Sequence, residues 1–236
     1  MIQNDQPNSL GADIAVGLSS IDDGNMKKEN MPFEIAKDVD SNRQKFLSQL
    51  GIGLDQTVLV RINYDRDDFT RYSVVSSADM GSGILPDKSI DINDALMTSE
   101  PNIALFLPLA DCVGAVLYEP SKKVLMVSHL GRHNLQQNGA YKSVQYMSEK
   151  SGIKPADIKV WLSPSAGKEN YPLHAMDNKS QQQVVLEQLE KAGITSQNID
   201  ISNIDTTIDD NYYSHSQYLK DHTSPNGRFA IVAMIL

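Results

Sequence analysis

Cysteine occurs once in the 236 residues, at Cys112, and tryptophan also occurs once. A single cysteine excludes an intramolecular disulfide, so a scaffold held by disulfides is ruled out. Proteins of a reducing compartment have this cysteine usage, and we expect a cytoplasmic location. The N-terminal segment MIQNDQPNSLG has neither the basic nor the apolar region of a secretory signal peptide, which agrees with that expectation.

Basic residues are also scarce, with 21 Lys and Arg against 30 Asp and Glu and a formal net charge of −9. Nucleic acids and anionic membrane surfaces bind clustered Lys and Arg, so neither is expected as the main partner. No apolar run approaches the roughly 18 residues of a membrane-spanning helix. We therefore expect a soluble intracellular globular protein. The oligomeric state is not predicted.

The length and a hydrophobic content of 40% are sufficient for one sizeable core. Residues 1–11 are polar and contain Pro7 and Gly11, and we predict that they form a disordered tail. Residues 12–236 are predicted to form one α/β domain.

Three short apolar segments form the centre of this domain: Ile103–Leu109, Val113–Tyr118 and Val124–His129. Segments of this length, rich in Val and Leu and bounded by turn residues, are typical of buried strands. Cys112 lies at the break between the first two segments, and His129 ends the third. Because neighbouring strands joined by short turns bring their ends together, we expect Cys112 and His129 to share one pocket.

Further strands and helices follow from the same patterns. The periodicity predicts a helix that begins at Asp40 or Ser41 and ends before Gly51 and Gly53. Two other helices are predicted over 137–151 and 180–192, each followed by a glycine. The remaining predicted strands are 12–20, 58–62, 72–77, 94–98, 160–162, 199–201 and 229–235.

Several motifs along the chain resemble those of the laccase-domain family, which includes purine nucleoside phosphorylases and the peptidoglycan editing factor. Leu109-Ala110-Asp111-Cys112 is similar to its T-A-D-C block, and His129-Leu130-Gly131 begins like its H-A-G-W-R-G block. Three more blocks occur in the family's order: Asp23-Gly24-Asn25-Met26 with the helix Asn42–Ile52, Tyr212-Tyr213-Ser214-His215, and Gly227-Arg228.

The resemblance implies a single-domain, mixed-sheet laccase-domain fold, which is similar to the fold of the cytotoxic necrotizing factor deamidases. It also implies a zinc enzyme that cleaves adenosine, inosine or guanosine with phosphate and has adenosine deamination as a side activity. In that scheme Cys112 and His129 are catalytic and bind Zn²⁺, which activates water. Asp111, His215 and Arg228 would contact the purine nucleoside or the phosphate.

This chain departs from the family at several functional positions. Tyr64 stands where a third metal-binding histidine is expected, and a phenol must lose its proton to coordinate well. The W-R-G after His129 and the arginine after His215 are absent, and Thr206-Thr207 stands near the place of a second cysteine. His133 or His215 could replace the third ligand. Five scattered histidines cannot supply the ligand sets of four copper ions, which disfavours an oxidase.

Two other functions therefore remain open. One is a pseudoenzyme or binding protein that keeps the fold without the complete metal site. The other is an amidase or peptidoglycan-editing hydrolase in which His129 activates the Cys112 thiol. Simpler structural roles exist as well: Cys112 as a small buried apolar residue, His129 as a hydrogen-bond partner of backbone, and Asp111 as a turn cap.

Overall fold

The strands form two mixed sheets in the computed structural model, which describes residues 5–7, 9–222 and 224–236. The four-stranded sheet has the order β1 (Ile14–Leu18), β10 (Phe229–Ile235), β5 (Ala104–Leu109), β2 (Thr57–Leu59). The six-stranded sheet has the order β3 (Tyr72–Val74), β4 (Ala95–Thr98), β7 (Val124–Leu130), β6 (Val113–Glu119), β8 (Lys159–Leu162), β9 (Ile199–Ile201). The pairs β2–β5, β3–β4 and β8–β9 are parallel, and the other pairs are antiparallel.

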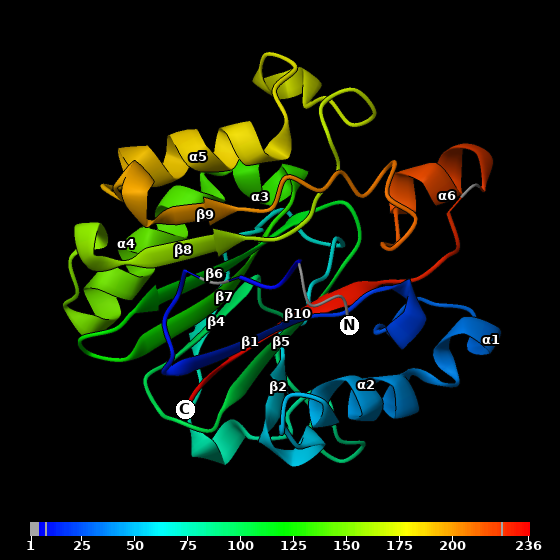
Figure 1. Ribbon diagram of the computed structural model, residues 1–236, viewed down its shortest axis with the longest axis horizontal. Helices are drawn as coiled ribbons and strands as arrows, with labels where there is room; N and C mark the ends of the chain where they lie inside the picture. Colours follow the sequence, from blue (N-terminus) through cyan, green and yellow to red (C-terminus); the bar gives the residue numbers. More distant parts are fainter. Residues whose placement is uncertain (1–4, 8, 223) are drawn as a thin grey trace.

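The two sheets pack face to face and enclose the central core. Leu105 and Ile231 of the smaller sheet belong to one buried cluster with Val116 and Val127 of the larger sheet. Helices α4 (Gly139–Ser151) and α5 (Gln181–Lys191) cover the outer face of the larger sheet, and α2 (Val39–Ser48) covers the smaller one (Figure 1). The result is a helix–sheet–sheet–helix sandwich, and the predicted α/β mixed-sheet fold is confirmed.

Most predicted elements are present within a few residues, but three short helices were not predicted: α1 (Phe33–Ala36), α3 (Arg132–Gln136) and α6 (His215–Asp221). The helix predicted over 137–151 begins only at Gly139, because Asn138 adopts a left-handed conformation with φ of 59°. A helix as short as α6 has no clear periodicity. Its N-terminus is capped by the Ser214 hydroxyl, which accepts a hydrogen bond from the Gln217 N–H.

The described part of the predicted tail contacts the sheets. Leu10 is buried in the core between them, and the Gln6 side chain exchanges two hydrogen bonds with the backbone of Leu18. Residues 1–4 and 8 lie outside the described residues, so the predicted disordered tail and domain boundary stay predictions. Across the part of the chain that the structure describes, no helix has the length and apolar character needed to cross a membrane.

Replacing Leu105 with alanine is expected to lower the free energy of unfolding by about 2–5 kcal/mol, because the side chain is fully buried between the sheets and its loss leaves a cavity. Urea denaturation followed by circular dichroism measures this change. Ile208→Ala is the control, since Ile208 is 74% exposed and its truncation should change stability by no more than about 0.5 kcal/mol. Equal effects of the two substitutions would contradict the assigned core.

Candidate functional site

A cavity of about 780 Å³ opens at one end of the sandwich, where β5 and β7 end and β6 and β10 begin. The strand register places these ends together, because Leu109 pairs with Phe229 and Gly114 pairs with His129. All six predicted site residues line this cavity: Tyr64, Asp111, Cys112, His129, His215 and Arg228. Its other lining side chains include Lys27, Glu29, Arg132, His133, Tyr171 and Lys220.

Cys112 and His129 meet beside Gly131. A Cβ atom on Gly131 would lie 2.9 Å from Cys112 Sγ and 3.0 Å from His129 Nε2, so both atoms border the same small space. Glycine at this position leaves room for the sulfur and the imidazole to approach each other. The expectation that the two side chains share one pocket is confirmed, whereas their catalytic roles stay predictions.

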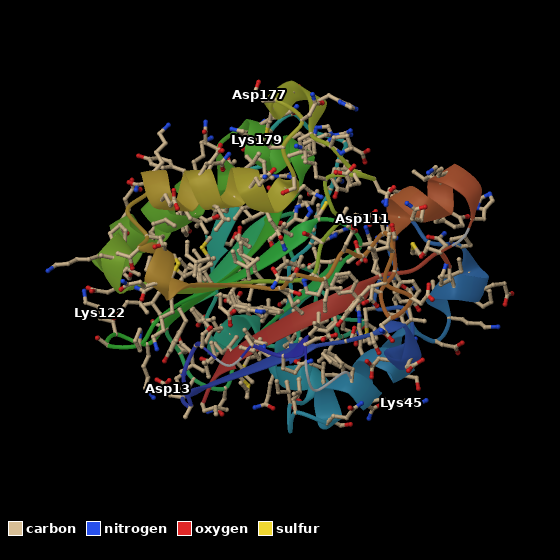
Figure 2. All side chains as sticks on the ribbon, turned by 45° about the horizontal axis from the view of Figure 1, so that its top comes forward. Asp13, Lys45, Asp111, Lys122, Asp177 and Lys179 are labelled. Atoms are coloured by element: carbon tan, nitrogen blue, oxygen red, sulfur yellow. The ribbon has the colours of Figure 1, made fainter. Side chains whose placement is uncertain are left out.

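Asp111 holds the turn that leads from β5 of the smaller sheet into β6 of the larger one. Its backbone is left-handed, with φ of 71°, and its carboxylate is buried. One carboxylate oxygen accepts a hydrogen bond from the Thr206 hydroxyl at 3.0 Å, and the other accepts from the Ser216 N–H at 2.6 Å. Figure 2 shows Asp111 beside α6. Both oxygens are engaged within the protein, which supports a positioning role for Asp111.

Asn25 forms hydrogen bonds with the backbones of two cationic residues that are far apart in the sequence. Its side-chain oxygen accepts hydrogen bonds from the backbone N–H groups of Lys27 (3.1 Å) and Arg228 (2.9 Å), while its amide donates to the Lys27 carbonyl. The Met26 N–H also donates a hydrogen bond to the Arg228 carbonyl, which joins the same two segments. As a result, the Lys27 and Arg228 side chains enter the cavity from adjacent backbones.

The helix motif that follows the Asp-Gly-Asn-Met block stabilises this arrangement. Asn42 donates a hydrogen bond to the Asn25 carbonyl at 3.1 Å, and the buried Arg43 donates to the Met26 carbonyl at 3.0 Å. Gly24 has a φ of 81° and lies against the Asn42 side chain, where a Cβ atom has no room. The two family blocks are therefore linked by direct contacts that position the cavity wall.

Tyr64 lies at the mouth of the cavity, with 53% of its surface exposed, and its hydroxyl reaches inward. Its ring is edge-on to His129, with centroids 6.3 Å apart, and it lies 6.2 Å from the His133 ring. His133 itself stacks on Phe69 at 4.9 Å. Burial of the hydroxyl, together with the nearby Cys112, raises the pKa of Tyr64, so the phenol keeps its proton at neutral pH.

Burial keeps the thiol and the imidazole uncharged. Desolvation, followed by the charge of Asp111, raises the pKa of Cys112 to about 12, although Arg228 and a hydrogen bond from Tyr64 act in the opposite direction. Desolvation and then the charge of Lys27 lower the pKa of His129 to about 3. A thiolate–imidazolium pair is therefore disfavoured at neutral pH, which argues against the Cys–His hydrolase.

His215 begins α6, and Arg228 directly precedes β10. Burial, with a smaller contribution from Arg228, lowers the pKa of His215, and its buried Nδ1 atom has no hydrogen-bond partner among the described residues. Burial also lowers the pKa of Arg228, while Tyr64 and Cys112 act to raise it. Both residues reach the cavity that holds Cys112, as predicted.

The residues present do not form a three-ligand zinc site. Within residues 5–7, 9–222 and 224–236, no three His, Cys, Asp or Glu side chains are grouped so that they could hold a metal ion. Neither His133 nor His215 therefore completes a set with Cys112 and His129. Tyr64, the weak third ligand of the sequence prediction, retains its proton and is a poor donor. The expected donor set is incomplete.

Sequence reasoning missed Lys27, Arg132 and Tyr171, which also line the cavity. Lys27 directly follows the Asp-Gly-Asn-Met block, and Arg132 directly precedes His133, so both positions lay beside motifs that had been identified. Tyr171 comes from a loop after β8 and carries no local signal. Only the folded chain shows that these three side chains face the same space.

Comparison with known proteins defines the class. Residues 19–184 match the family described as multi-copper polyphenol oxidoreductase laccase, and the chain belongs to this family. It is 26% identical to the purine nucleoside phosphorylase YlmD of Bacillus subtilis, in an alignment covering 89% of this chain and 86% of that protein. It is also 26% identical to a purine nucleoside phosphorylase of Corynebacterium glutamicum, over 56% of this chain and 50% of that protein.

Solved structures show the same fold. The hypothetical protein YfiH of Bacillus licheniformis superimposes with a TM-score of 0.83 and 21% identity, covering 94% of this chain and 93% of that one. YlmD of Geobacillus stearothermophilus gives a TM-score of 0.82 and 20% identity, over 95% and 92% of the two chains. The predicted laccase-domain fold is thereby confirmed.

Alkylation of Cys112 is expected to be slow at neutral pH and to accelerate continuously as the pH rises above 9, because a thiol with a pKa of about 12 forms thiolate only in alkaline solution. The measurement is the iodoacetamide modification rate by mass spectrometry between pH 6 and the highest pH at which the fold persists. Free cysteine is the reference. A rate above that of free cysteine at pH 7 would instead indicate an activated nucleophile.

Replacing Asp111 with asparagine should lower the free energy of unfolding by about 1–2 kcal/mol, because the Ser216 N–H and the Thr206 hydroxyl would then face a neutral amide in place of a carboxylate. Urea denaturation measures the loss. Thr206→Ser, which retains the hydroxyl that donates to Asp111, is the matched control and should be milder. If Asp111→Asn were as stable as the parent protein, the positioning role would be wrong.

Proposed function

We propose that the cavity binds a purine nucleoside together with phosphate and catalyses phosphorolysis of the glycosidic bond. The observation that carries this proposal is the composition of the cavity wall: cationic side chains and tyrosine rings converge on one space large enough for both reactants. The similarity to relatives named purine nucleoside phosphorylase supports the same reaction class.

The charges of the wall favour an anion. Lys27, Arg132, Lys220 and Arg228 line the cavity, whereas the carboxylates there are Glu29 and Asp111. The Asp111 carboxylate is occupied by Thr206 and the Ser216 backbone. Cationic side chains that surround a half-buried space attract anionic reactants even when the protein as a whole carries a net charge of −9.

The aromatic residues favour a flat ring system. Tyr64 and Tyr171 line the cavity, and the Tyr64 ring lies 6.3 Å from the His129 ring and 6.2 Å from the His133 ring. Offset or edge-on contacts between such rings and a purine add to the free energy gained from burying apolar surface. The cavity volume of about 780 Å³ lies in the range of small-molecule sites.

In the proposed reaction an oxygen of hydrogenphosphate forms a bond to C1′ of the ribose as the C1′–N9 bond breaks. The purine leaves with the electron pair and takes up the proton that phosphate loses, giving ribose 1-phosphate and free base. Lys27 and Arg228 would hold the phosphate against C1′ and neutralise its charge. No step is assigned to a metal ion, because the donor set for one is incomplete.

Incubation with inosine, adenosine or guanosine should release free base only when phosphate is present, and liquid chromatography measures both products. Arg228→Met should reduce kcat/KM for phosphate by roughly tenfold to a hundredfold, since it removes a charged hydrogen-bond donor. Lys45→Met is the control, because Lys45 lies on the exposed side of α2 (Figure 2) and should leave turnover unchanged.

The incomplete metal site favours one other candidate, a nucleoside-binding protein without turnover. If none of the three nucleosides is cleaved but inosine still raises the melting temperature, and Tyr64→Ala abolishes that rise, phosphorolysis is refuted and binding alone remains. If inosine neither reacts nor binds, both candidates are wrong.

A further inference from the structure

We propose that the Lys27 ammonium replaces a divalent metal ion as the cation beside Cys112 and His129, so that the pocket binds a tetrahedral oxyanion such as phosphate and does not take up zinc. The proposal concerns the binding preference of the pocket. It does not require that any nucleoside be cleaved.

The first argument is the composition of the donor set. A zinc site needs a third protein ligand beside Cys112 and His129, and Tyr64 stands in its place. The phenol of Tyr64 approaches the same sulfur but has a proton that zinc would have to displace. Cys112 and His129 with a protonated phenol as the third ligand bind zinc more weakly than a set of two imidazoles and a thiolate does.

The second argument is the charge that the chain itself brings to this space. Lys27 and Arg228 reach the cavity from backbones that Asn25 ties together through hydrogen bonds of 3.1 and 2.9 Å. Lys27 lines the same cavity as Cys112 and His129, and burial, followed by the charge of Arg228, lowers the pKa of Lys27. Two fixed positive charges beside the sulfur repel a divalent cation, and the same two charges attract an oxyanion.

The third argument is that Lys27 is not neutralised within the protein. Glu29 is the nearby carboxylate, yet among the described residues Lys27 forms no ion pair and its Nζ atom donates no hydrogen bond. By contrast, the neighbouring Lys28 points away from the cavity and pairs with Asp40. A half-buried ammonium without a partner is available to bind an anion.

Gly131 leaves space for an anion beside Cys112 and His129. Because it has no side chain, the region next to Cys112 Sγ and His129 Nε2 stays open towards the cavity. An oxyanion held there by Lys27 and Arg228 would lie beside the sulfur of Cys112 and the imidazole of His129.

The first experiment measures anion binding by isothermal titration calorimetry with inorganic phosphate and, separately, sulfate. Lys27→Met should weaken both affinities by at least roughly tenfold, because a charged donor is removed. Lys28→Met is the matched control and should bind like the parent protein, since Lys28 lies outside the cavity. Unchanged affinity in Lys27→Met, or no binding of either anion by the parent protein, would overturn the proposal.

The second experiment measures metal content by mass spectrometry after incubation with zinc sulfate and desalting. The parent protein should retain only substoichiometric zinc, while the double variant Tyr64→His, Lys27→Ala should retain close to one equivalent because it gains a second imidazole as the third donor and loses the competing charge. Tyr64→Phe, Lys27→Ala is the matched control and should remain nearly metal-free, since it adds no donor.

Stoichiometric zinc in the parent protein that Cys112→Ala abolishes would overturn the proposal. Circular dichroism melting curves verify that each variant is folded. Because neither experiment involves nucleoside turnover, the inference can hold when phosphorolysis fails, and phosphorolysis can occur in a protein that contradicts the inference by retaining zinc.

Discussion

The buried carboxylate of Asp111 is the interaction on which the site depends. It stands where the chain crosses from β5 of one sheet to β6 of the other, in a left-handed conformation that costs an L-residue about 1–2 kcal/mol. Hydrogen bonds from Thr206 and the Ser216 backbone stabilise this turn and attach the segments that carry them. Without this carboxylate, the turn that carries Cys112 would lose its hydrogen bond to the helix that begins at His215.

The electrostatics of the cavity differ from those of the whole chain. The protein is acidic, yet Lys27 and Arg228 meet at the end of the sheets because Asn25 accepts a hydrogen bond from each backbone. Burial keeps the thiol of Cys112 and the imidazole of His129 uncharged, so the cations are not balanced by the groups beside them. The resulting excess of positive charge favours phosphate binding and disfavours zinc binding, so one cause supports both proposals.

Local patterns were sufficient for the central strands and for the pocket that Cys112 and His129 share. Each apolar segment had a length and composition typical of a buried strand, and short turns left few ways to arrange the strand ends. The helix α6 and the break at Asn138 were not predicted. A short helix has too few turns to show periodicity, whereas the Asn138-Gly139 pair, which favours a left-handed turn residue, was overlooked beside the apolar periodicity.

By itself, the amino-acid sequence determined the fold family and the buried strands, and it predicted Tyr64 at the place of an expected metal-binding histidine. These properties depend on side-chain type and on neighbours along the chain. Only the tertiary structure decided that Lys27 joins Arg228 in the cavity and that no third metal ligand reaches Cys112 and His129 within the described residues. The physical reason is that such contacts depend on strand register and on long-range hydrogen bonds, which connect positions as far apart as Asn25 and Arg228.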